Sequence, residues 1–507
     1  MPSKSSPLDF IPTSLLKNCS DIFAPIICTL ANLSFSDGNF PAAFKNAQIT
    51  PLLKKPGLDA DSPENYRPIS NLNTISKILE KLFSSRLKEH IRLSSNLNPF
   101  QSAYRQFHST ETALLRIMND IFTSIDGKKI TILVALDLSA AFDTIDHSAL
   151  LHRMEYTFGI SGLALQWIST YLNGRDQYVK VDDSSSENYK CQIGVPQGSV
   201  LGPLLFSLFV APVSNVVSSF GVNYHQYADD TQLFIGCECG EMNNNIHLMN
   251  TCTTELNKWF LMNGLCLNPS KSESIFLGTG AQVNKVRSIS SILVADNPID
   301  ISREIKSLGV VFDERLSFDA HVDGICKSAH FHIRALRHIR QSLSTDVAKT
   351  VACSIIGSRI DYCNSLLNGV SAKNIDKLQR VQNTVARVIT GHRKSDHITP
   401  ILRDLHWLPI RFRIKFKLCT IVFKTLVNNE PVYLRDLLNY PQSVRTLRST
   451  GLRLLNIPYC STVMASRAFS IAAPTVWNEL PFEIRNCNSF SSFKNKLKTF
   501  FFQKSFT

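Results

Sequence analysis

The sequence predicts a mixed α+β protein. The run Ile130–Leu136 is apolar and rich in β-branched residues, as is typical of a buried strand. Two further β-prone runs, 222–226 and 231–235, flank Tyr227-Ala228-Asp229-Asp230 and predict a hairpin. Between residues 241 and 263, apolar side chains recur at near-helical spacing. At 507 residues, the chain is long enough for several domains and a large core.

The elements before the hairpin follow in chain order. Residues 1–45 are expected to form a helical extension, with an apolar run at 22–33 and a turn at Asp37-Gly38-Asn39. Residues 46–130 include a helix at 76–92. Residues 131–280 are expected to hold, besides the buried strand and the hairpin, a helix near His147–Tyr156, a surface hairpin around Asn173-Gly174 and an apolar helix at 200–217.

The C-terminal part of the chain is distinguished by its charge. Residues 281–318 are expected to form strands and turns, and 319–400 to form basic helices. Residues 301–507 contain 31 Lys and Arg against 14 Asp and Glu, whereas residues 1–300 contain 23 against 27. A positive field of this kind attracts a phosphate backbone. The last part of this basic segment, residues 401–507, is expected to form a basic C-terminal region. No motif in it indicates a chemical role.

Basic and aromatic residues alternate at 411–417. Two interpretations carry similar weight: an amphipathic helix that turns its charge toward phosphates, or an ordinary surface helix. A basic helix on a membrane surface is a less favoured third.

The chain is not expected to be secreted or to enter a membrane. The stretch 191–228 has no Lys, Arg, Asp or Glu, but Gly, Pro, Ser and Asn interrupt it, so a buried helix is favoured over a membrane span. The 13 cysteines show no zinc-binding spacing, and there is no secretory signal. We expect reduced thiols and a location in the nucleus, the cytoplasm or both.

Adjacent carboxylates at a hairpin turn are electrostatically costly. Asp229 and Asp230 repel each other unless a proton or a cation intervenes. A divalent cation removes that cost, and hard oxygen ligands favour Mg²⁺. The competing interpretation is a solvated turn, since Asp favours turns. Asp137 ends the buried strand, where it is either a second source of metal ligands or a strand-ending turn residue.

Three motifs together resemble the palm of a reverse transcriptase. They are Asp137-x-x-x-x-Phe142, Gly194-Val195-Pro196-Gln197-Gly198-Ser199 and Tyr227-Ala228-Asp229-Asp230. More narrowly, the chain resembles the polymerase of non-LTR, LINE-like retrotransposons of the Jockey type. The supporting strings are Lys54-Lys55-Pro56, Asn65-Tyr66-Arg67-Pro68-Ile69-Ser70, Gln101-Ser102-Ala103-Tyr104-Arg105, Leu267-Asn268-Pro269-Ser270-Lys271, Tyr362-Cys363-Asn364, His406-Trp407-Leu408-Pro409 and Ala473-Pro474-Thr475-Val476-Trp477.

The resemblance implies an RNA-directed DNA polymerase with a right-hand fold. Its fingers would be residues 46–130, its palm, built on an antiparallel sheet, 131–280, and its connection and helical thumb 281–400, with the reverse transcriptase domain at about 46–280. The partners implied are an RNA template, a DNA primer and dNTPs. Two Mg²⁺ ions, with Mn²⁺ as the alternative, would be held by Asp137, Asp229, Asp230 and the Leu138 carbonyl.

Further roles are carried over from the family motif by motif. Phe142 would be a steric gate against the 2′-hydroxyl, and Lys271 would protonate the departing pyrophosphate. The residues that would contact the nucleotide, its triphosphate or the template are Lys54, Lys55, Arg67, Gln197 and Gly198. The competing interpretations are a core aromatic for Phe142, solvated side chains for the basic residues, and a turn for Gln197-Gly198.

Other functions stay open. A catalytically silent nucleic-acid-binding remnant of a retrotransposon polymerase is the main alternative, and an RNA-dependent RNA polymerase, disfavoured by Phe142, is the second. Relatives of this type usually carry an endonuclease ahead of the polymerase. We expect that module to be lost or to lie elsewhere, because polymerase-like sequence begins close to Met1.

Overall fold

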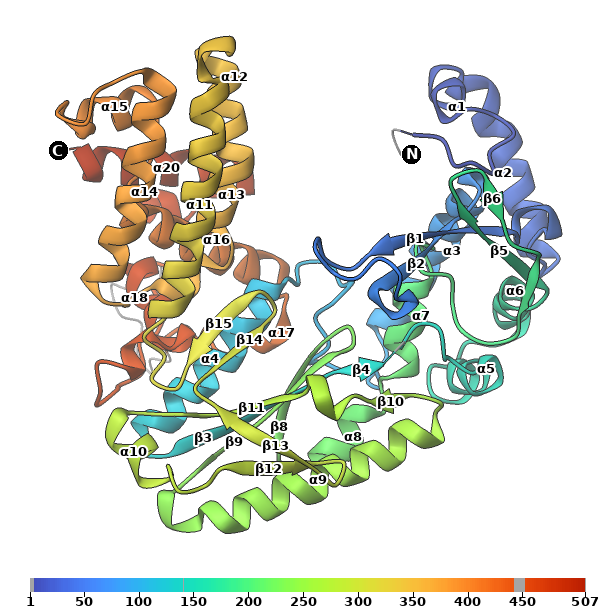
Figure 1. Ribbon diagram of the computed structural model, residues 1–507, viewed down its shortest axis with the longest axis horizontal. Helices are drawn as coiled ribbons and strands as arrows, with labels where there is room; N and C mark the ends of the chain where they lie inside the picture. Colours follow the sequence, from blue (N-terminus) through green and yellow to red (C-terminus); the bar gives the residue numbers. More distant parts are fainter. Residues whose placement is uncertain (1–3, 140, 442–451, 507) are drawn as a thin grey trace. The chain divides into compact units, whose positions relative to one another are not determined.

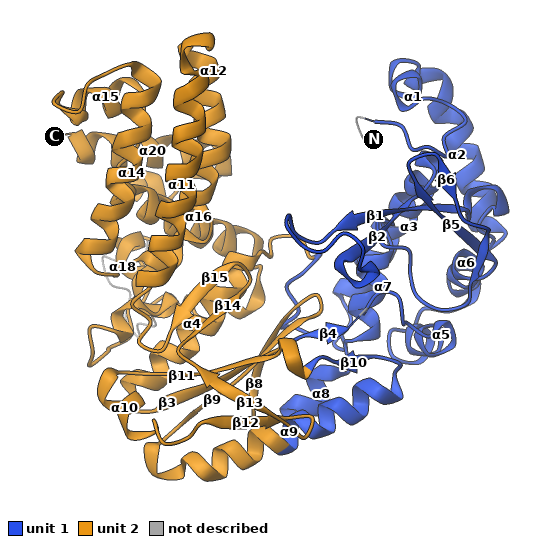
Figure 2. Cartoon of the chain, in the orientation of Figure 1, with its two compact units in different colours: residues 1–104, 137–221, 251–268 blue, residues 105–136, 222–250, 269–507 orange. Residues whose placement is uncertain are grey.

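The computed structural model describes residues 4–139, 141–441 and 452–506 (Figure 1). Parts of the expected N-terminal extension, palm and C-terminal region therefore lie outside the described residues. The chain divides into two compact units (Figure 2): residues 1–104, 137–221 and 251–268 form unit 1, and residues 105–136, 222–250 and 269–507 form unit 2. Each unit combines segments that are far apart in sequence. The division into fingers, palm and thumb stays a prediction.

A six-stranded sheet is the centre of unit 2. Its strand order is β12-β13-β11-β3-β9-β8. The predicted strand and hairpin are both present, as β3 and as β8 with β9. The pairs among β3, β8, β9 and β11 are all antiparallel, which confirms the antiparallel sheet expected within residues 131–280. Outside that range, β13 pairs in parallel with β11 and antiparallel with β12. The strands are β3 (Ile130–Leu136), β8 (Asn223–Tyr227), β9 (Asp230–Cys237), β11 (Glu273–Leu277), β12 (Ser291–Val294) and β13 (Asn297–Ser302).

Helix α4 (Thr110–Asp126) packs against β3, β8 and β9. Its N-terminus is closed by a capping box, in which the Ser109 side chain accepts a hydrogen bond from the Thr112 amide and the Thr112 side chain accepts one from the Ser109 amide. Its apolar side chains, such as Leu114, Ile117 and Ile121, are almost completely buried. Burial of this face holds the helix on the sheet that carries Asp229.

The sheet of unit 1 contains β2 (Tyr66–Asn71), β1 (Ala47–Leu53), β5 (Arg175–Val181), β6 (Ser184–Ser185) and β7 (Tyr189–Cys191). Unit 1 also contains helices α3 (Thr74–Arg92), α5 (His147–Tyr156) and α6 (Gly162–Leu172), and α5 packs against α6. The predicted helices at 76–92 and His147–Tyr156 are confirmed by α3 and α5.

The surface hairpin expected around Asn173-Gly174 was wrong. Helix α6 continues to Leu172, and β5 begins at Arg175, so these two residues join a helix to a strand. Gly174 has a φ of 67°, which suits the turn that leaves a helix. The hairpin lies one strand later, between β5 and β6. Burial of Trp167, Ile168 and Tyr171 extends the helix beyond what the turn residues alone indicate.

The apolar stretch 200–217 forms two helices instead of one, α7 (Gly202–Phe209) and α8 (Val213–Ser218). Pro212 lies between them and offers no amide for a continuous helix. The predicted burial is confirmed, because Leu205, Phe206 and Phe209 are fully buried. Across the described residues, no helix combines the length and apolar character that a membrane crossing requires.

The other helical expectations agree with the structure. Residues 1–45 contain α1 (Thr13–Asn18) and α2 (Ser20–Ser36), and 241–263 contain α9 (Met242–Met262). Residues 281–318 contain α10 (Gly280–Lys285), β14 (Glu304–Ser307) and β15 (Val310–Asp313) besides β12 and β13. The later helices include α11 (Asp319–Ile339), α12 (Thr345–Ala352), α13 (Ser358–Asp361), α14 (Ala372–Thr390), α15 (Ile398–Asp404), α16 (Ile410–Asn428), α17 (Val432–Arg435), α18 (Phe469–Asn478), α19 (Phe482–Arg485) and α20 (Phe490–Phe506).

Candidate active site

The β8–β9 hairpin presents Asp229 in a two-residue turn. Tyr227 pairs with Asp230, so Ala228 and Asp229 form the turn itself. Ala228 has a φ of 60°, although it carries a Cβ and is only 7% exposed. The left-handed region costs such a residue about 1–2 kcal/mol. The paired strands on either side hold the turn in this conformation, which fixes where the Asp229 backbone lies.

The register of β3 brings its C-terminal end beside the start of β9. Leu136 pairs with Thr231, which directly follows Asp230. Asp137 follows Leu136 directly in the chain and belongs to unit 1, whereas the hairpin belongs to unit 2.

Asp137 continues into the short strand β4 (Leu138–Ser139), which pairs with β10 (Cys266–Leu267). The Asn268 amide donates to the Asp137 carbonyl at 2.9 Å. Leu138 and Leu267 are consequently a non-hydrogen-bonded pair of this antiparallel ladder, so the Leu138 carbonyl is directed away from β10. That direction is compatible with the ligand role expected for it.

Lys271 ends a single 3₁₀ turn, Pro269–Lys271, just before β11. Glu273 of β11 pairs with Ala135 of β3, and the two strands run antiparallel. Lys271 therefore lies beyond the same end of the sheet at which β3 terminates. Its side chain is exposed.

Phe142 is held by the loop that contains Gly194 and Val195. Its ring stacks on Phe206 of α7, with centroids 4.7 Å apart and planes 24° apart, and its carbonyl accepts from the Val195 amide at 2.9 Å. Gly194 has a φ of 81°, and a Cβ there would lie 2.6 Å from the Asp143 carbonyl oxygen. His147 Nε2 donates to the Gly194 carbonyl at 2.7 Å. Only glycine allows the two loops to approach this closely.

Gln197 and Gly198 are connected both to the Phe142 loop and to β2. Gln197 Nε2 donates to Asp143 Oδ2 at 2.7 Å, and the Gln197 carbonyl accepts from the Ser70 amide at 2.7 Å. Burial raises the pKa of the Asp143 carboxyl group, and the hydrogen bond from Gln197 opposes that rise. Gly198 has a φ of 112°, and a Cβ there would lie 2.9 Å from the Ser70 carbonyl oxygen. Unit 1 thus brings Phe142, Gln197 and Gly198 together.

Sequence reasoning missed Glu80, a completely buried residue of α3 that supports this loop. Its Oε2 accepts from the Val200 and Leu201 amides at 2.7 and 3.1 Å, and its Oε1 accepts from Ser76 Oγ at 3.1 Å. Burial raises the pKa of Glu80, whereas these hydrogen bonds lower it. The available signal was a carboxylate at helical spacing from the apolar residues Phe83 and Leu87, which are buried on the same helix. Asp143 was missed too, although it directly follows Phe142.

Lys54, Lys55 and Arg67 are exposed around the β1–β2 hairpin of unit 1. Arg67 pairs with Leu52 across the ladder, and Lys54 Nζ donates to the Glu64 carbonyl at 2.7 Å. Within the described parts of the chain, no carboxylate forms an ion pair with any of the three side chains. Their charge is therefore available to an anionic ligand.

The basic residues of α16 are largely neutralised within unit 2. Arg413 Nε donates to Asp361 Oδ1 at 2.9 Å, while Lys415 lies 2.8 Å from Glu479 and Lys417 lies 3.4 Å from Glu111. Of the two favoured interpretations of residues 411–417, the phosphate-facing helix loses support. Three charges of α16 join this helix to neighbouring segments.

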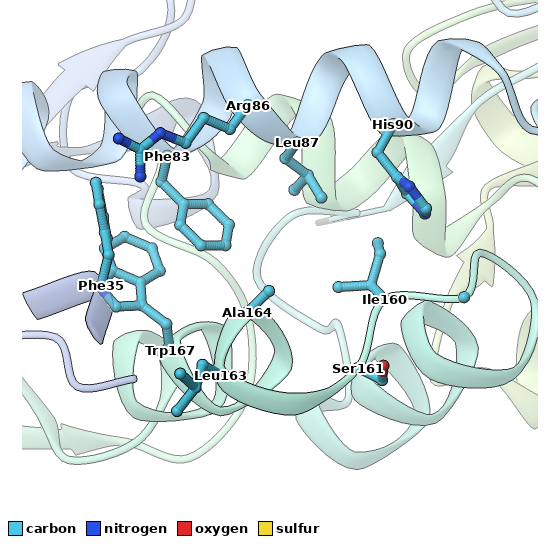
Figure 3. A pocket seen from close by; sticks show the side chains of 11 residues that line it. Phe35, Phe83, Arg86, Leu87, His90, Ile160, Ser161, Leu163, Ala164 and Trp167 are labelled. Carbon is cyan, nitrogen blue, oxygen red and sulfur yellow. The ribbon is translucent and has the colours of Figure 1, made fainter. Parts of the chain in front are cut away.

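Two cavities of unit 1 differ in their relation to the predicted site. One, of about 450 Å³, is lined by Gln197, Asp143 and residues of β1, β2, β5 and β7. The other, of about 410 Å³, lies between α3 and α6, where Phe83 stacks on Trp167 and Arg86 lies over Phe35 (Figure 3). This aromatic cavity contains none of the predicted site residues. In the described residues, no three His, Cys, Asp or Glu side chains are already gathered to hold a metal ion.

A family model described as "Reverse transcriptase (RNA-dependent DNA polymerase)" matches residues 53–312, just over half of the chain. The chain belongs to the reverse transcriptase family. The predicted α+β class with a right-hand polymerase fold is that of this family, and reverse transcriptases in general depend on a divalent metal. The family resemblance inferred from the motifs is thus confirmed.

The curated relatives of this reverse transcriptase come from non-LTR elements. It is 29% identical over 429 residues to the probable RNA-directed DNA polymerase from transposon BS of Drosophila melanogaster, covering 80% of this chain and 45% of the relative. It is 26% identical over 400 residues to the RNA-directed DNA polymerase from mobile element jockey of Drosophila funebris, covering 77% and 42%. The chain spans less than half of these relatives. Among solved structures, the match to an apo telomerase from Candida tropicalis covers 84% of this chain and 74% of the telomerase chain. The two are 11% identical, with a TM-score of 0.40.

Proposed function

We propose that this chain is an RNA-directed DNA polymerase of a LINE-like retrotransposon, which extends a DNA primer on an RNA template. The observation that carries the proposal is the strand register of the sheet. Leu136 opposite Thr231 and Tyr227 opposite Asp230 support a site in which the carboxylates of Asp137, Asp229 and Asp230 lie at adjacent strand ends. The proposed setting is the nucleus or the cytoplasm.

The donor atoms of the proposed metal site fit Mg²⁺. Carboxylate oxygens from Asp137, Asp229 and Asp230, with the Leu138 carbonyl, are hard ligands of the type that Mg²⁺ and Mn²⁺ prefer. Two such ions, when bound, would supply activation of the primer 3′-hydroxyl and charge neutralisation at the leaving pyrophosphate.

The remaining proposed roles are binding, exclusion and proton transfer. Lys54, Lys55 and Arg67 bind triphosphate oxygens, Arg67 through its fork of donors. Phe142 excludes a 2′-hydroxyl, and Lys271 donates a proton to the pyrophosphate as it leaves. Gln197 and Gly198 contact the nucleotide and the template base. The exposure of the basic side chains supports the first group of roles, and the hydrogen bonds that fix the Phe142 and Gln197 loops support the others.

Primer extension tests the proposal. The purified chain should extend oligo(dT) on poly(rA) with dTTP and Mg²⁺, and Asp229→Asn should lower the rate by at least about 100-fold. Asp183→Asn, an exposed carboxylate in the turn between β5 and β6, is the matched control and should retain the rate. Hybrid binding without extension by the wild type would favour the silent remnant. Incorporation of ribonucleotides in preference to dTTP would favour the RNA polymerase.

A further inference from the structure

A tyrosine of the C-terminal region packs against the hairpin that carries Asp229. Tyr433 belongs to α17 and is 2% exposed. Its ring meets the ring of His225 edge to face, with centroids 5.0 Å apart and planes at 87°. His225 is completely buried in β8, the strand that leads into the Ala228-Asp229 turn. Edge-to-face contact is a favourable and directional arrangement of two rings.

Tyr433 is itself fixed to the first turns of α4. Its hydroxyl donates to Thr112 Oγ1 at 3.0 Å, and its carbonyl accepts from Arg116 Nη1 at 3.2 Å. The ring also meets His108 edge to face, with centroids 5.5 Å apart. Thr112 is part of the capping box of α4, so the hydroxyl of Tyr433 is bonded to a rigid group. Tyr433 therefore joins the hairpin to the helix that covers the sheet.

Burial, together with nearby arginines, lowers the pKa of His225 to about 3 and that of His108 to about 4. With pKa values this low, both rings beside Tyr433 are uncharged near neutral pH. Neutral rings pack against the tyrosine without burying an unpaired charge.

Tyr227 rests on the same side of the hairpin as His225, because side chains two residues apart share one face of a strand. His225 lies three residues before Ala228, so its contact with Tyr433 holds this face of β8 close to the strained turn.

We propose that Tyr433 is a positioning residue, which holds His225 against α4 and so keeps the Ala228-Asp229 turn in one geometry for metal binding. The inference rests on the proposed function and extends it to the C-terminal region, to which the sequence assigned no chemistry. Displacements of about 1 Å at a catalytic group lower rates by about 100-fold. A side chain that contacts no substrate can therefore control the rate.

Three variants separate positioning from general stability. Tyr433→Leu removes the ring, and Tyr433→Phe keeps it but removes the hydroxyl. Val432→Ala changes a 46% exposed neighbour in the same helix and serves as the control. Each variant is measured in three ways: hydrogen exchange of the amides of 223–237, Mn²⁺ affinity by electron paramagnetic resonance without nucleic acid, and kcat and KM per titrated active site.

For Tyr433→Leu we expect exchange in the hairpin to rise by about tenfold or more, the Kd for Mn²⁺ to rise by about tenfold, and kcat to fall by about 10–100-fold. The KM for the template–primer should stay within about twofold, because the Tyr433 side chain is only 2% exposed. Tyr433→Phe, which keeps the ring and loses only the hydrogen bond to Thr112, should show these shifts at about threefold, and Val432→Ala should show none of them. Unchanged exchange and unchanged Mn²⁺ affinity in folded Tyr433→Leu would overturn the proposal.

Thr112→Val provides the same test if Tyr433→Leu does not fold. It removes the hydroxyl partner while conserving side-chain shape, and we expect the same shifts at about threefold; no shift would overturn the proposal. The result also separates this inference from the proposed function. An inactive wild type whose hairpin exchange responds to Tyr433 contradicts the polymerase assignment alone. An active wild type without that response contradicts the positioning role alone.

Discussion

Ala228 shows how a single residue can mark a functional turn. A φ of 60° is unfavourable for alanine, and the turn keeps it between two hydrogen-bonded strands. Strain of this size persists where the surrounding structure determines the backbone, which is common at ligand-binding sites. The proposed role of Asp229 and Asp230 as cation ligands would explain why this turn is strained.

Phe142→Val is the residue-scale prediction for sugar selection. The half-buried Phe142 ring is held by Phe206, so shortening it should open space for a 2′-hydroxyl. We expect the preference for dTTP over UTP to fall by about tenfold or more, measured by single-nucleotide incorporation. Phe206→Leu, which alters the packing partner instead, should change the preference less. An unchanged preference in Phe142→Val would remove the gate role.

Gly194→Ala is the residue-scale prediction for the contact between the two loops. Gly194 and Gly221 both have positive φ, at 81° and 66°, but only a Cβ at Gly194 meets another backbone. Gly221→Ala should therefore lower the free energy of unfolding by about 1–2 kcal/mol, and Gly194→Ala by clearly more. Denaturant unfolding measures both, and primer extension should fall only for Gly194→Ala. Equal effects would show that the close approach to Asp143 is unimportant.

At the scale of elements, two basic helices of unit 2 differ in whether their charged side chains form ion pairs. On α16, Arg413, Lys415 and Lys417 are matched by carboxylates of other segments. On α11, Lys327, Arg334 and Arg337 are exposed, and no carboxylate in the described chain pairs with them. Net charge of the C-terminal part alone could not distinguish these two helices.

Replacing the three residues of each set by Gln tests this difference. The α11 variant should bind a template–primer more weakly. The slope of log association constant against log salt concentration should become smaller by about 2, since each lost phosphate contact reduces that slope by about 0.7–0.9. The α16 variant should unfold at lower denaturant concentration with its salt slope unchanged. A reduced salt slope for the α16 variant would restore the phosphate-facing interpretation.

At the scale of the whole molecule, buried histidines make stability depend on pH. The pKa values of His225 and His108 are lowered to about 3 and about 4, below the ordinary value of an unfolded histidine. The folded state keeps its full stability above about pH 6.5, where these histidines are neutral in both the folded and the unfolded protein. It loses stability as the pH falls toward those values, because the unfolded state takes up protons first. Between about pH 7 and pH 5, each histidine should lower the free energy of unfolding by about 2 kcal/mol. Denaturant unfolding at several pH values in this range measures the loss. In His225→Gln, the free energy of unfolding should depend less steeply on pH.

Local patterns predicted much of the fold, and long-range packing accounts for what they missed. Periodicity and composition were sufficient for β3, the β8–β9 hairpin and α5, because these patterns depend on neighbouring residues. They failed at Asn173-Gly174, where burial of α6 decided the structure. Glu80 and Tyr433 were missed because their partners lie far away in sequence.

The central claim is that Asp137, Asp229 and Asp230 share two divalent ions in one active site. Its most direct test is the number of Mn²⁺ ions bound per chain, measured by electron paramagnetic resonance in a complex with template–primer and a non-hydrolysable dNTP analogue. We predict two ions for the wild type and fewer for both Asp137→Asn and Asp229→Asn. Two ions in all three proteins, or none in the wild type, would contradict the claim.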